Sequence, residues 1–301
     1  MITIDRQKSQ SPLFHLQTDC SSYIVWVHEN GQLINLYYGK RLSHSINLRD
    51  LFQNYSTQVG SSTLYRQGSN ITLDTLQLEY PGYGKGDYRT PAFLFEYEDG
   101  STTIDFVFFD YKLHNEKLSP ESQPHVRNDH HVDAPLETLE IVLKERTKNV
   151  LIHLFYTPVE TTDAVLRFTR VTNLDASSLT IKSVMSFNLD YSHASFDLLT
   201  LDGMWIRERQ VNRARLRPGI LSIDSKKGVS GANHNPFIAL LEPDASELRG
   251  TVFGFSLLYS GNFTGKVEKS PYEMSRVQMG ITDFEFEWQL IPQMAFDTPE
   301  S

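Results

Sequence analysis

The chain has 301 residues, of which 40% are hydrophobic and 12% aromatic, a composition typical of a globular protein that favours strands over long helices. Its formal net charge of −9 argues against a nucleic acid or an anionic membrane as the main partner, because both bind through Lys and Arg. Neutral ligands suit the chain better.

Along the chain, hydrophobic residues mostly recur with a period of two, the pattern of strands with one buried face. The clearest examples are residues 138–145, 149–157, 164–173 and 179–192. Turn signals such as Glu29-Asn30-Gly31 and Glu98-Asp99-Gly100 separate the strands. No stretch of 12 residues has convincing helical spacing, and no repeat of fixed period is evident.

These patterns predict an all-β fold with few helices, in which residues 1–301 form a single domain. With more than a dozen short strands, a large antiparallel two-sheet β-sandwich is the expected architecture. The polar stretches 40–70, 114–135 and 243–249 are predicted to be long loops carried on the sandwich.

The stretch LEYPGYGKGDYRTPAFLFEYEDGST, residues 78–102, is rich in glycine and tyrosine. Gly82, Gly84 and Gly86 lack the spacing of a dinucleotide or P-loop fingerprint, and a strand rather than a helix follows them. Composition alone therefore indicates a glycine-rich connection whose tyrosines pack on a neighbour.

Several segments resemble a known family. LDTLQLEYPGYGKGDYRTPAF is similar to the segment by which the N-terminal domain of family 36 glycoside hydrolases, the retaining α-galactosidases, is most easily identified, with Leu78 where that pattern has Gln. FDLLTLDGMWIRERQ, DSKKGVSGANHNPFIAL and VFGFSLLYSGNF resemble later segments of the same domain, in the same order. The resemblance covers about residues 2–299. It implies a supersandwich of the galactose-mutarotase type.

The resemblance also implies which part of the enzyme is present. The family places its two catalytic aspartates on a (β/α)8 barrel that follows the sandwich. These aspartates are the nucleophile and the acid/base, which a retaining mechanism requires roughly 5 Å apart. One of them lies in a Lys-Trp-Asp motif. The tryptophans here are Trp26, Trp205 and Trp288, and none stands in that motif. We expect a non-catalytic domain, inactive alone, with no catalytic residues and no cofactor.

In the resembling family this domain packs on the barrel, helps to build tetramers and lends loops to the galactose pocket. Sugar recognition uses an aromatic face and charged planar groups. Trp205 with Arg207, Glu208 and Arg209 offers this combination, as does the pair His234 and Asn235. Asp50 is matched loosely to an acidic residue that reaches a neighbouring site. The alternative is structural, with Trp205 packed in the core and Glu208 in an internal salt bridge.

Other residues suggest contacts between subunits or domains. An interface role is predicted for Tyr83, Asp87, Tyr88 and Arg89. The arginines between 207 and 217 are interpreted as an interface loop rather than an RNA site, because aromatic platforms are lacking. Asp129, His130, His131 and Asp133 could bind a metal, but a solvated loop is the preferred interpretation, so no metal is expected.

Cys20 is the only cysteine, which excludes an intrachain disulfide and indicates a reducing compartment. The start MITIDRQKSQ has no apolar run behind a basic segment, and no later stretch approaches the roughly 20 apolar residues of a membrane helix. We expect a cytoplasmic protein.

Two functions stay open. The first is the accessory, oligomerising domain of an α-galactosidase acting on melibiose and raffinose-type oligosaccharides. The second is a stand-alone carbohydrate-binding or aldose-epimerase-like sandwich, since one fold can host several functions.

Overall fold

The computed structural model describes residues 1–5, 11–43, 47–53, 63–66, 71–127 and 136–301. These residues form 19 strands and three short 3-10 helices, η1 (Leu48–Leu51), η2 (Leu73–Thr75) and η3 (Glu160–Thr162). The predicted all-β character and the scarcity of helices are therefore confirmed. Within these ranges, no helix has the length and apolar character needed to cross a membrane.

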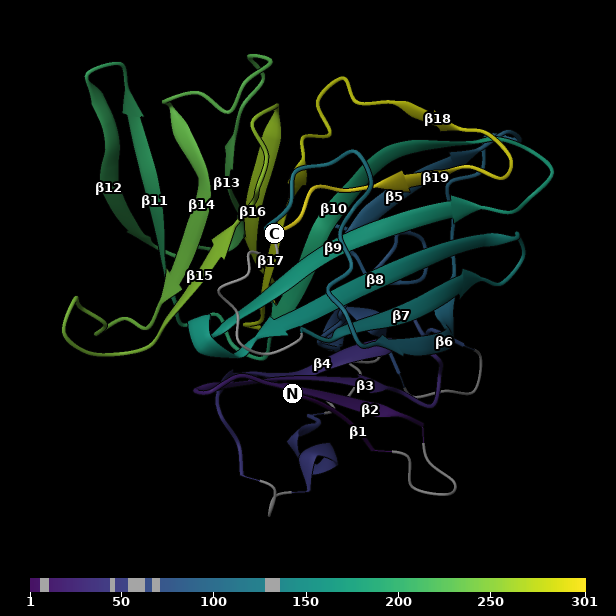
Figure 1. The fold of residues 1–301 in the computed structure, drawn as a ribbon, viewed down its shortest axis with the longest axis horizontal. Helices are drawn as coiled ribbons and strands as arrows, with labels where there is room; N and C mark the ends of the chain where they lie inside the picture. The colour runs from purple at the N-terminus through teal and green to yellow at the C-terminus, as the bar shows by residue number, and fades with distance from the viewer. Residues whose placement is uncertain (6–10, 44–46, 54–62, 67–70, 128–135) are drawn as a thin grey trace.

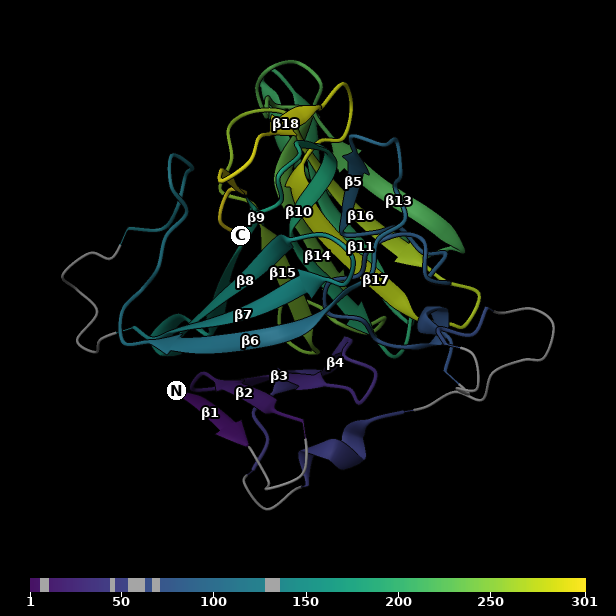
Figure 2. The ribbon, with the colours of Figure 1, turned by 90° about the vertical axis from the view of Figure 1, so that its right-hand side faces the viewer.

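The strands pair antiparallel in four sheets. The N-terminal sheet (purple) lies apart from the other strands in Figures 1 and 2. The N-terminal sheet has the order β1 (Ile2–Asp5), β2 (Leu13–Gln17), β3 (Ser21–Val27), β4 (Leu33–Lys40). The hairpin sheet has the order β12 (Arg207–Arg215), β11 (Asp197–Met204), β14 (His234–Leu241), β15 (Val252–Ser256).

The other two sheets are larger. The five-stranded sheet has the order β19 (Ala295–Asp297), β9 (Ala164–Asn173), β8 (Val150–Val159), β7 (Thr138–Glu145), β6 (Phe106–His114). The central sheet has the order β13 (Gly219–Asp224), β16 (Phe263–Lys269), β17 (Ser275–Ile281), β10 (Leu179–Tyr191), β18 (Trp288–Leu290), and β5 (Phe93–Tyr97) also pairs with β10.

The predicted two-sheet sandwich, and with it the supersandwich of galactose-mutarotase type, is therefore wrong. Hydrogen bonding divides the strands into four small sheets, arranged more like the blades of a four-bladed propeller. The strand segments themselves were predicted well: 138–145 is β7 and 164–173 is β9. The period-two pattern identifies which face of a strand is buried, but it does not identify the neighbouring strand.

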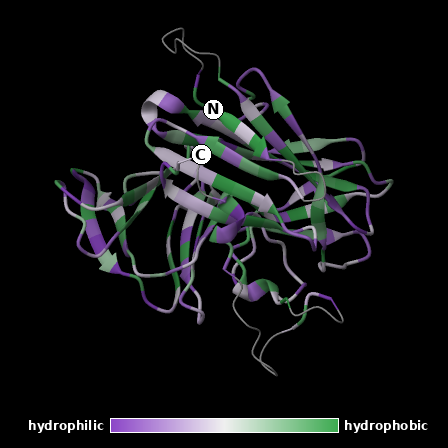
Figure 3. Cartoon of the chain, turned by 90° about the horizontal axis from the view of Figure 1, so that it is seen from below, coloured by the Kyte–Doolittle hydropathy of each residue, from purple (hydrophilic) through white to green (hydrophobic). Residues whose placement is uncertain are grey.

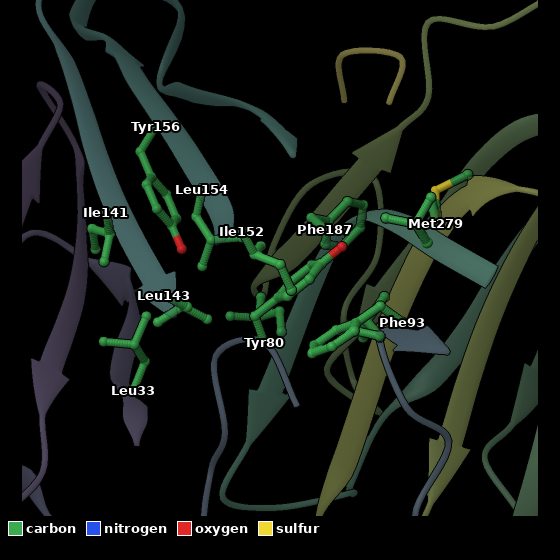
Figure 4. Close-up of a cluster of buried hydrophobic side chains, with 14 of the residues drawn as sticks. Leu33, Tyr80, Phe93, Ile141, Leu143, Ile152, Leu154, Tyr156, Phe187 and Met279 are labelled. Carbon is green, nitrogen blue, oxygen red and sulfur yellow. The ribbon is translucent and has the colours of Figure 1, made fainter. Parts of the chain in front are cut away.

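Among the described residues, the largest hydrophobic cluster lies between the sheets. It takes side chains from all four, including Phe14 of β2, Phe187 of β10, Leu198 of β11 and Ile152 of β8. Figure 4 shows part of it, with Ile141, Leu143, Ile152 and Leu154 facing Tyr80, Phe93 and Phe187. Hydrophobic and hydrophilic residues alternate along the strands (Figure 3), as expected when only one face of each strand is buried.

Candidate functional site

Among the described residues, the most exposed aromatic side chain lies at the tip of the β11–β12 hairpin. Met204 pairs with Arg207, so Trp205 and Ile206 form a two-residue turn. The side chain of Trp205 is 81% exposed and that of Ile206 is 72% exposed. The interpretation of Trp205 as a core aromatic is therefore wrong. The β11–β12 hairpin projects from the rest of the molecule in Figure 1. Its tip therefore presents a flat aromatic surface to solvent.

The backbone of this tip is strained. Ile206 has φ of 71° and Arg209 has φ of 57°, a left-handed conformation that is rare for a β-branched or long side chain. Gly203 is required beneath them, because a Cβ there would lie 2.2 Å from the carbonyl oxygen of Arg207. Such strain costs about 1–3 kcal/mol per residue and is concentrated at functional sites.

Glu208 is oriented by the turn. Its Oε1 accepts a hydrogen bond from the Ile206 amide at 2.9 Å. Among the residues that the structure describes, no basic group forms an ion pair with Glu208. Arg207, Glu208 and Arg209 are all exposed, next to the Trp205 ring in sequence.

His234 is joined to the hairpin by a residue that the sequence did not indicate, Asp202. Its Oδ1 lies 2.9 Å from His234 Nδ1, and its Oδ2 accepts hydrogen bonds from Thr200 Oγ1 at 2.9 Å and Asn212 Nδ2 at 3.2 Å. Burial opposes ionisation, but His234 and these donors outweigh it and lower the pKa of Asp202. Asp202 stands three residues before Trp205, and that spacing was the only available signal.

The remaining predicted pocket residues do not all meet at this tip. Asn235 follows His234 on β14 and is half-buried. Asp50 is exposed on η1, which packs against β4 of the N-terminal sheet, and its Oδ1 accepts a hydrogen bond from Asn47 Nδ2 at 2.9 Å. In Figure 1 the N-terminal sheet lies at the bottom and the tip of the β11–β12 hairpin at the top left, so one chain does not bring Asp50 and Trp205 together.

The residues predicted at an interface divide into two groups. Tyr83 and Tyr88 are exposed, and the Tyr88 hydroxyl lies 2.6 Å from Thr63 Oγ1. Asp87 and Arg89 are buried and bind each other at 2.8 Å. The surface offered to a partner by this stretch therefore consists of the two tyrosines.

Asp87 and Arg89 belong to an internal ionic cluster with Asp190 and Arg276. Arg276 lies 2.8 Å from Asp87 and 2.7 Å from Asp190, and Arg89 lies 3.1 Å from Asp190. Arg89 also donates to the carbonyl of Leu73 at 2.9 Å. Burial raises the cost of ionisation, but the guanidinium groups of Arg276 and Arg89 lower the pKa of Asp87.

The arginines of segment 207–217 lie mainly on a strand, because residues 207–215 form β12 and not the predicted loop. The candidate metal ligands Asp129, His130, His131 and Asp133 lie outside the described residues. Within the described ranges, no group of three or more His, Cys, Asp or Glu side chains could hold a metal ion.

A cavity of about 500 Å³, which the sequence patterns did not indicate, lies between β4, β9, β10 and β15. Its lining includes Tyr38, Phe187, Phe253 and Phe255, together with Arg167. Ser301 also lines it. The strands that line it come from all four sheets, which explains why periodicity within single strands could not reveal it.

The described residues define an all-β domain with an exposed aromatic and charged hairpin tip, and the fold by itself does not determine its function. Comparison with known proteins is more specific: residues 31–291 match the family described as "Glycosyl hydrolase family 36 N-terminal domain". The chain belongs to this family, as its sequence motifs indicated.

Relatives agree over nearly the whole chain. The α-galactosidase AgaA of Geobacillus stearothermophilus is 34% identical over 97% of this chain and 39% of its own length. The crystal structure of the α-galactosidase from Lactobacillus brevis has a TM-score of 0.92 at 32% identity, and covers 98% of this chain and 39% of its own. A structure of AgaA in complex with raffinose has a TM-score of 0.91. The chain thus spans about 40% of the length of these relatives.

Proposed function

We propose that this chain is the non-catalytic N-terminal part of a retaining α-galactosidase that hydrolyses terminal α-galactosides such as melibiose and raffinose-type oligosaccharides. Family membership over residues 31–291 supports the proposal. So do the relatives, which are α-galactosidases about 2.5 times as long as the matched segment. The domain packs on the catalytic barrel of the same polypeptide, in a cytoplasmic homo-oligomer, and is inactive alone.

The main support for a substrate-binding role of this domain is the exposure of Trp205. An indole ring that is 81% exposed loses the free energy of burial unless a partner covers it. The C–H face of a galactose ring provides such a cover, and the neighbouring Arg207, Glu208 and Arg209 supply groups for hydroxyls. In this proposal the hairpin tip forms one wall of the substrate pocket, with His234 and Asn235 behind it, and Asp50 serves a neighbouring subunit.

The test uses the full-length parent enzyme and the isolated 301-residue chain, each assayed with raffinose. We expect activity only in the parent. Trp205→Ala in the parent should raise KM roughly two- to twelvefold, because a stacked ring contributes about 0.5–1.5 kcal/mol. Val211→Ala is the matched control, since Val211 is exposed on the same hairpin but away from the tip. Unchanged kinetics of Trp205→Ala would contradict the pocket role.

A further inference from the structure

The cavity beside β15 has the form of a vacant strand position. One wall is β15, with residues 251–256, and the opposite wall is the start of β9, with residues 164–167. Both walls are strand edges. Among the described residues, β15 pairs on one side only, with β14, and Ala164–Leu166 of β9 pair only with β8.

The hydrogen bonds of β15 show which of its backbone groups face the cavity. The amide of Glu242 donates to Thr251, and that of Leu257 donates to Pro236, so the odd-numbered residues of β15 point to β14. In an antiparallel ladder alternate residues point to opposite sides. The amides and carbonyls of Val252, Gly254 and Ser256 therefore face the cavity, and these three residues are exposed while Phe255 is buried.

The end of the described chain already enters this position. Phe296 of β19 pairs with Val171 of β9, and farther along Ser301 and Arg167 exchange two backbone hydrogen bonds of 2.9 and 2.8 Å. On the other side, the amide of Leu258 donates to the carbonyl of Glu300 at 2.9 Å. The C-terminal segment thus lies antiparallel to β9 and makes the first contact with the chain that leaves β15.

The spacing of these contacts fixes the direction of any continuation. Leu258 bonds to Glu300, so the next cavity-facing residue of β15, Ser256, would meet the second residue after Glu300. Gly254 and Val252 follow at the same interval, and Val165 faces the same path from β9. At about 3.3 Å per residue, about five further residues in extended conformation would span the cavity.

The floor of the cavity is aromatic, which indicates the kind of side chain that the segment would place there. Tyr38 and Phe253 have ring centroids 5.5 Å apart, and Phe187 is stacked on Phe255 at 5.4 Å. Alternate residues of an extended strand would point at this aromatic floor, which favours apolar side chains there.

From this geometry we infer that the cavity is filled, in the parent enzyme, by an extended strand formed by the residues that directly follow Ser301. This strand pairs with β9 on one side and β15 on the other, and so joins the five-stranded sheet to the hairpin sheet. The inference rests on the proposed function, because it requires a longer polypeptide. It gives the domain a second role, which is to hold the hairpin sheet, and with it Trp205, in a fixed position relative to the polypeptide that leads to the catalytic domain.

The test compares amide hydrogen exchange, read at single residues, in the 301-residue chain and in the same chain extended by the ten or so residues that follow in the parent. In the extended chain the amides of Val252, Gly254 and Ser256 should exchange roughly fivefold more slowly or better, the effect of about one net hydrogen bond each. Phe253 and Phe255 should change less, since their amides already face β14. This alternation distinguishes strand pairing from general burial.

Two controls complete the experiment. A Gly/Ser extension of equal length should protect the same amides much less, because it has no side chains for the aromatic floor and low strand propensity. The amides of β12, the opposite edge of the same sheet, should not change. Equal exchange in the short and extended chains would overturn the inference. Protection that rises with concentration of the 301-residue chain would also overturn it, because a second copy would then fill the cavity. Raffinose hydrolysis by the parent is measured separately, so a failed proposed function remains distinguishable from a failed strand.

Discussion

Replacement of Arg276 is the sharpest test of how the buried ionic cluster stabilises the fold. The cluster balances two carboxylates, Asp87 and Asp190, against two guanidinium groups, Arg89 and Arg276, and all four side chains are at most 5% exposed. Arg276→Met keeps most of the side-chain volume but leaves two buried carboxylates facing one cation. Removal of one partner from a buried pair costs about 3–5 kcal/mol. This is a large part of the roughly 5–15 kcal/mol by which a typical domain is stable.

The stability lost in Arg276→Met should depend on pH. In the native protein the pKa of Asp87 is lowered, so its contribution to stability is present above the unfolded pKa of about 3.9 and is lost as the pH falls through the lower folded value. In Arg276→Met the unpaired carboxylate should instead bind a proton more readily when buried. The loss of stability relative to the native protein should therefore be larger at pH 7 than at pH 4.5.

Urea unfolding of both proteins at the two pH values, followed by tryptophan fluorescence, measures this difference. The control is the double variant Arg276→Met with Asp87→Asn, which restores the charge balance while its amide oxygen still accepts from Arg89. It should be more stable at pH 7 than Arg276→Met alone. The reasoning is refuted if the single variant loses less than about 1 kcal/mol, the range of an exposed pair, or if its loss is the same at both pH values.

Three further predictions concern other parts of the molecule. Glu140 lies 2.7 Å from both His114 and His153, which, against the effect of burial, lower its pKa to about 2. The ionised Glu140 should stabilise the fold by about 1 kcal/mol after allowance for partial exposure, above pH 4.5, and this contribution should be lost toward pH 2. In urea unfolding, the stability of Glu140→Gln should therefore depend less on acid pH than that of the native protein. Ile206→Gly should raise the free energy of unfolding by about 1 kcal/mol, because glycine relieves the positive φ and the exposed side chain loses little packing; a destabilised variant would show that the turn is not strained. Tyr88→Ala should weaken assembly of the parent enzyme in sedimentation analysis without lowering its thermal stability, and an unchanged oligomer would exclude Tyr88 from the interface.

The choice of Tyr88 rather than Arg89 follows from burial. If Arg89 lay at the interface predicted from the sequence, Arg89→Ala would also be a test of assembly. Because Arg89 is buried with Asp87 and donates to the carbonyls of Leu73 and Leu76, that substitution would destabilise the fold and lose the oligomer for the wrong reason.

The sequence was sufficient for the strands but not for the sheets. The segment 179–191 was predicted as a strand because its pattern is strong, yet β10 pairs with three strands, β17, β18 and β5. The paired residues of these partners lie about 80 to 110 residues away in the sequence, on both sides of β10. Register between such distant segments is set by tertiary packing, which a local pattern does not encode.

Charged residues in the sequence were misplaced for a related reason. Asp87 and Arg89 look like surface residues, since Asp and Arg are seldom fully buried unless paired. Their partner Arg276 is 189 residues from Asp87, so the pairing that makes burial possible was not visible. Trp205 shows the opposite case, in which a large aromatic residue expected in the core is exposed, because the turn places it beyond the packed part of the hairpin.

The arginines of β12 explain how the hairpin can be both firmly attached and exposed at its tip. At the base, Arg213 and Arg215 bind Asp197 at 2.8 and 3.3 Å. Arg213 also donates to the carbonyl of Ala245 at 2.7 Å, so it connects β12 to the loop that follows β14. Within the described residues, neither Arg207 nor Arg209 near the tip forms an ion pair. The basic residues therefore differ in role: Arg213 and Arg215 at the base position the ribbon, whereas Arg207 and Arg209 at the tip have no ion pair among the described residues.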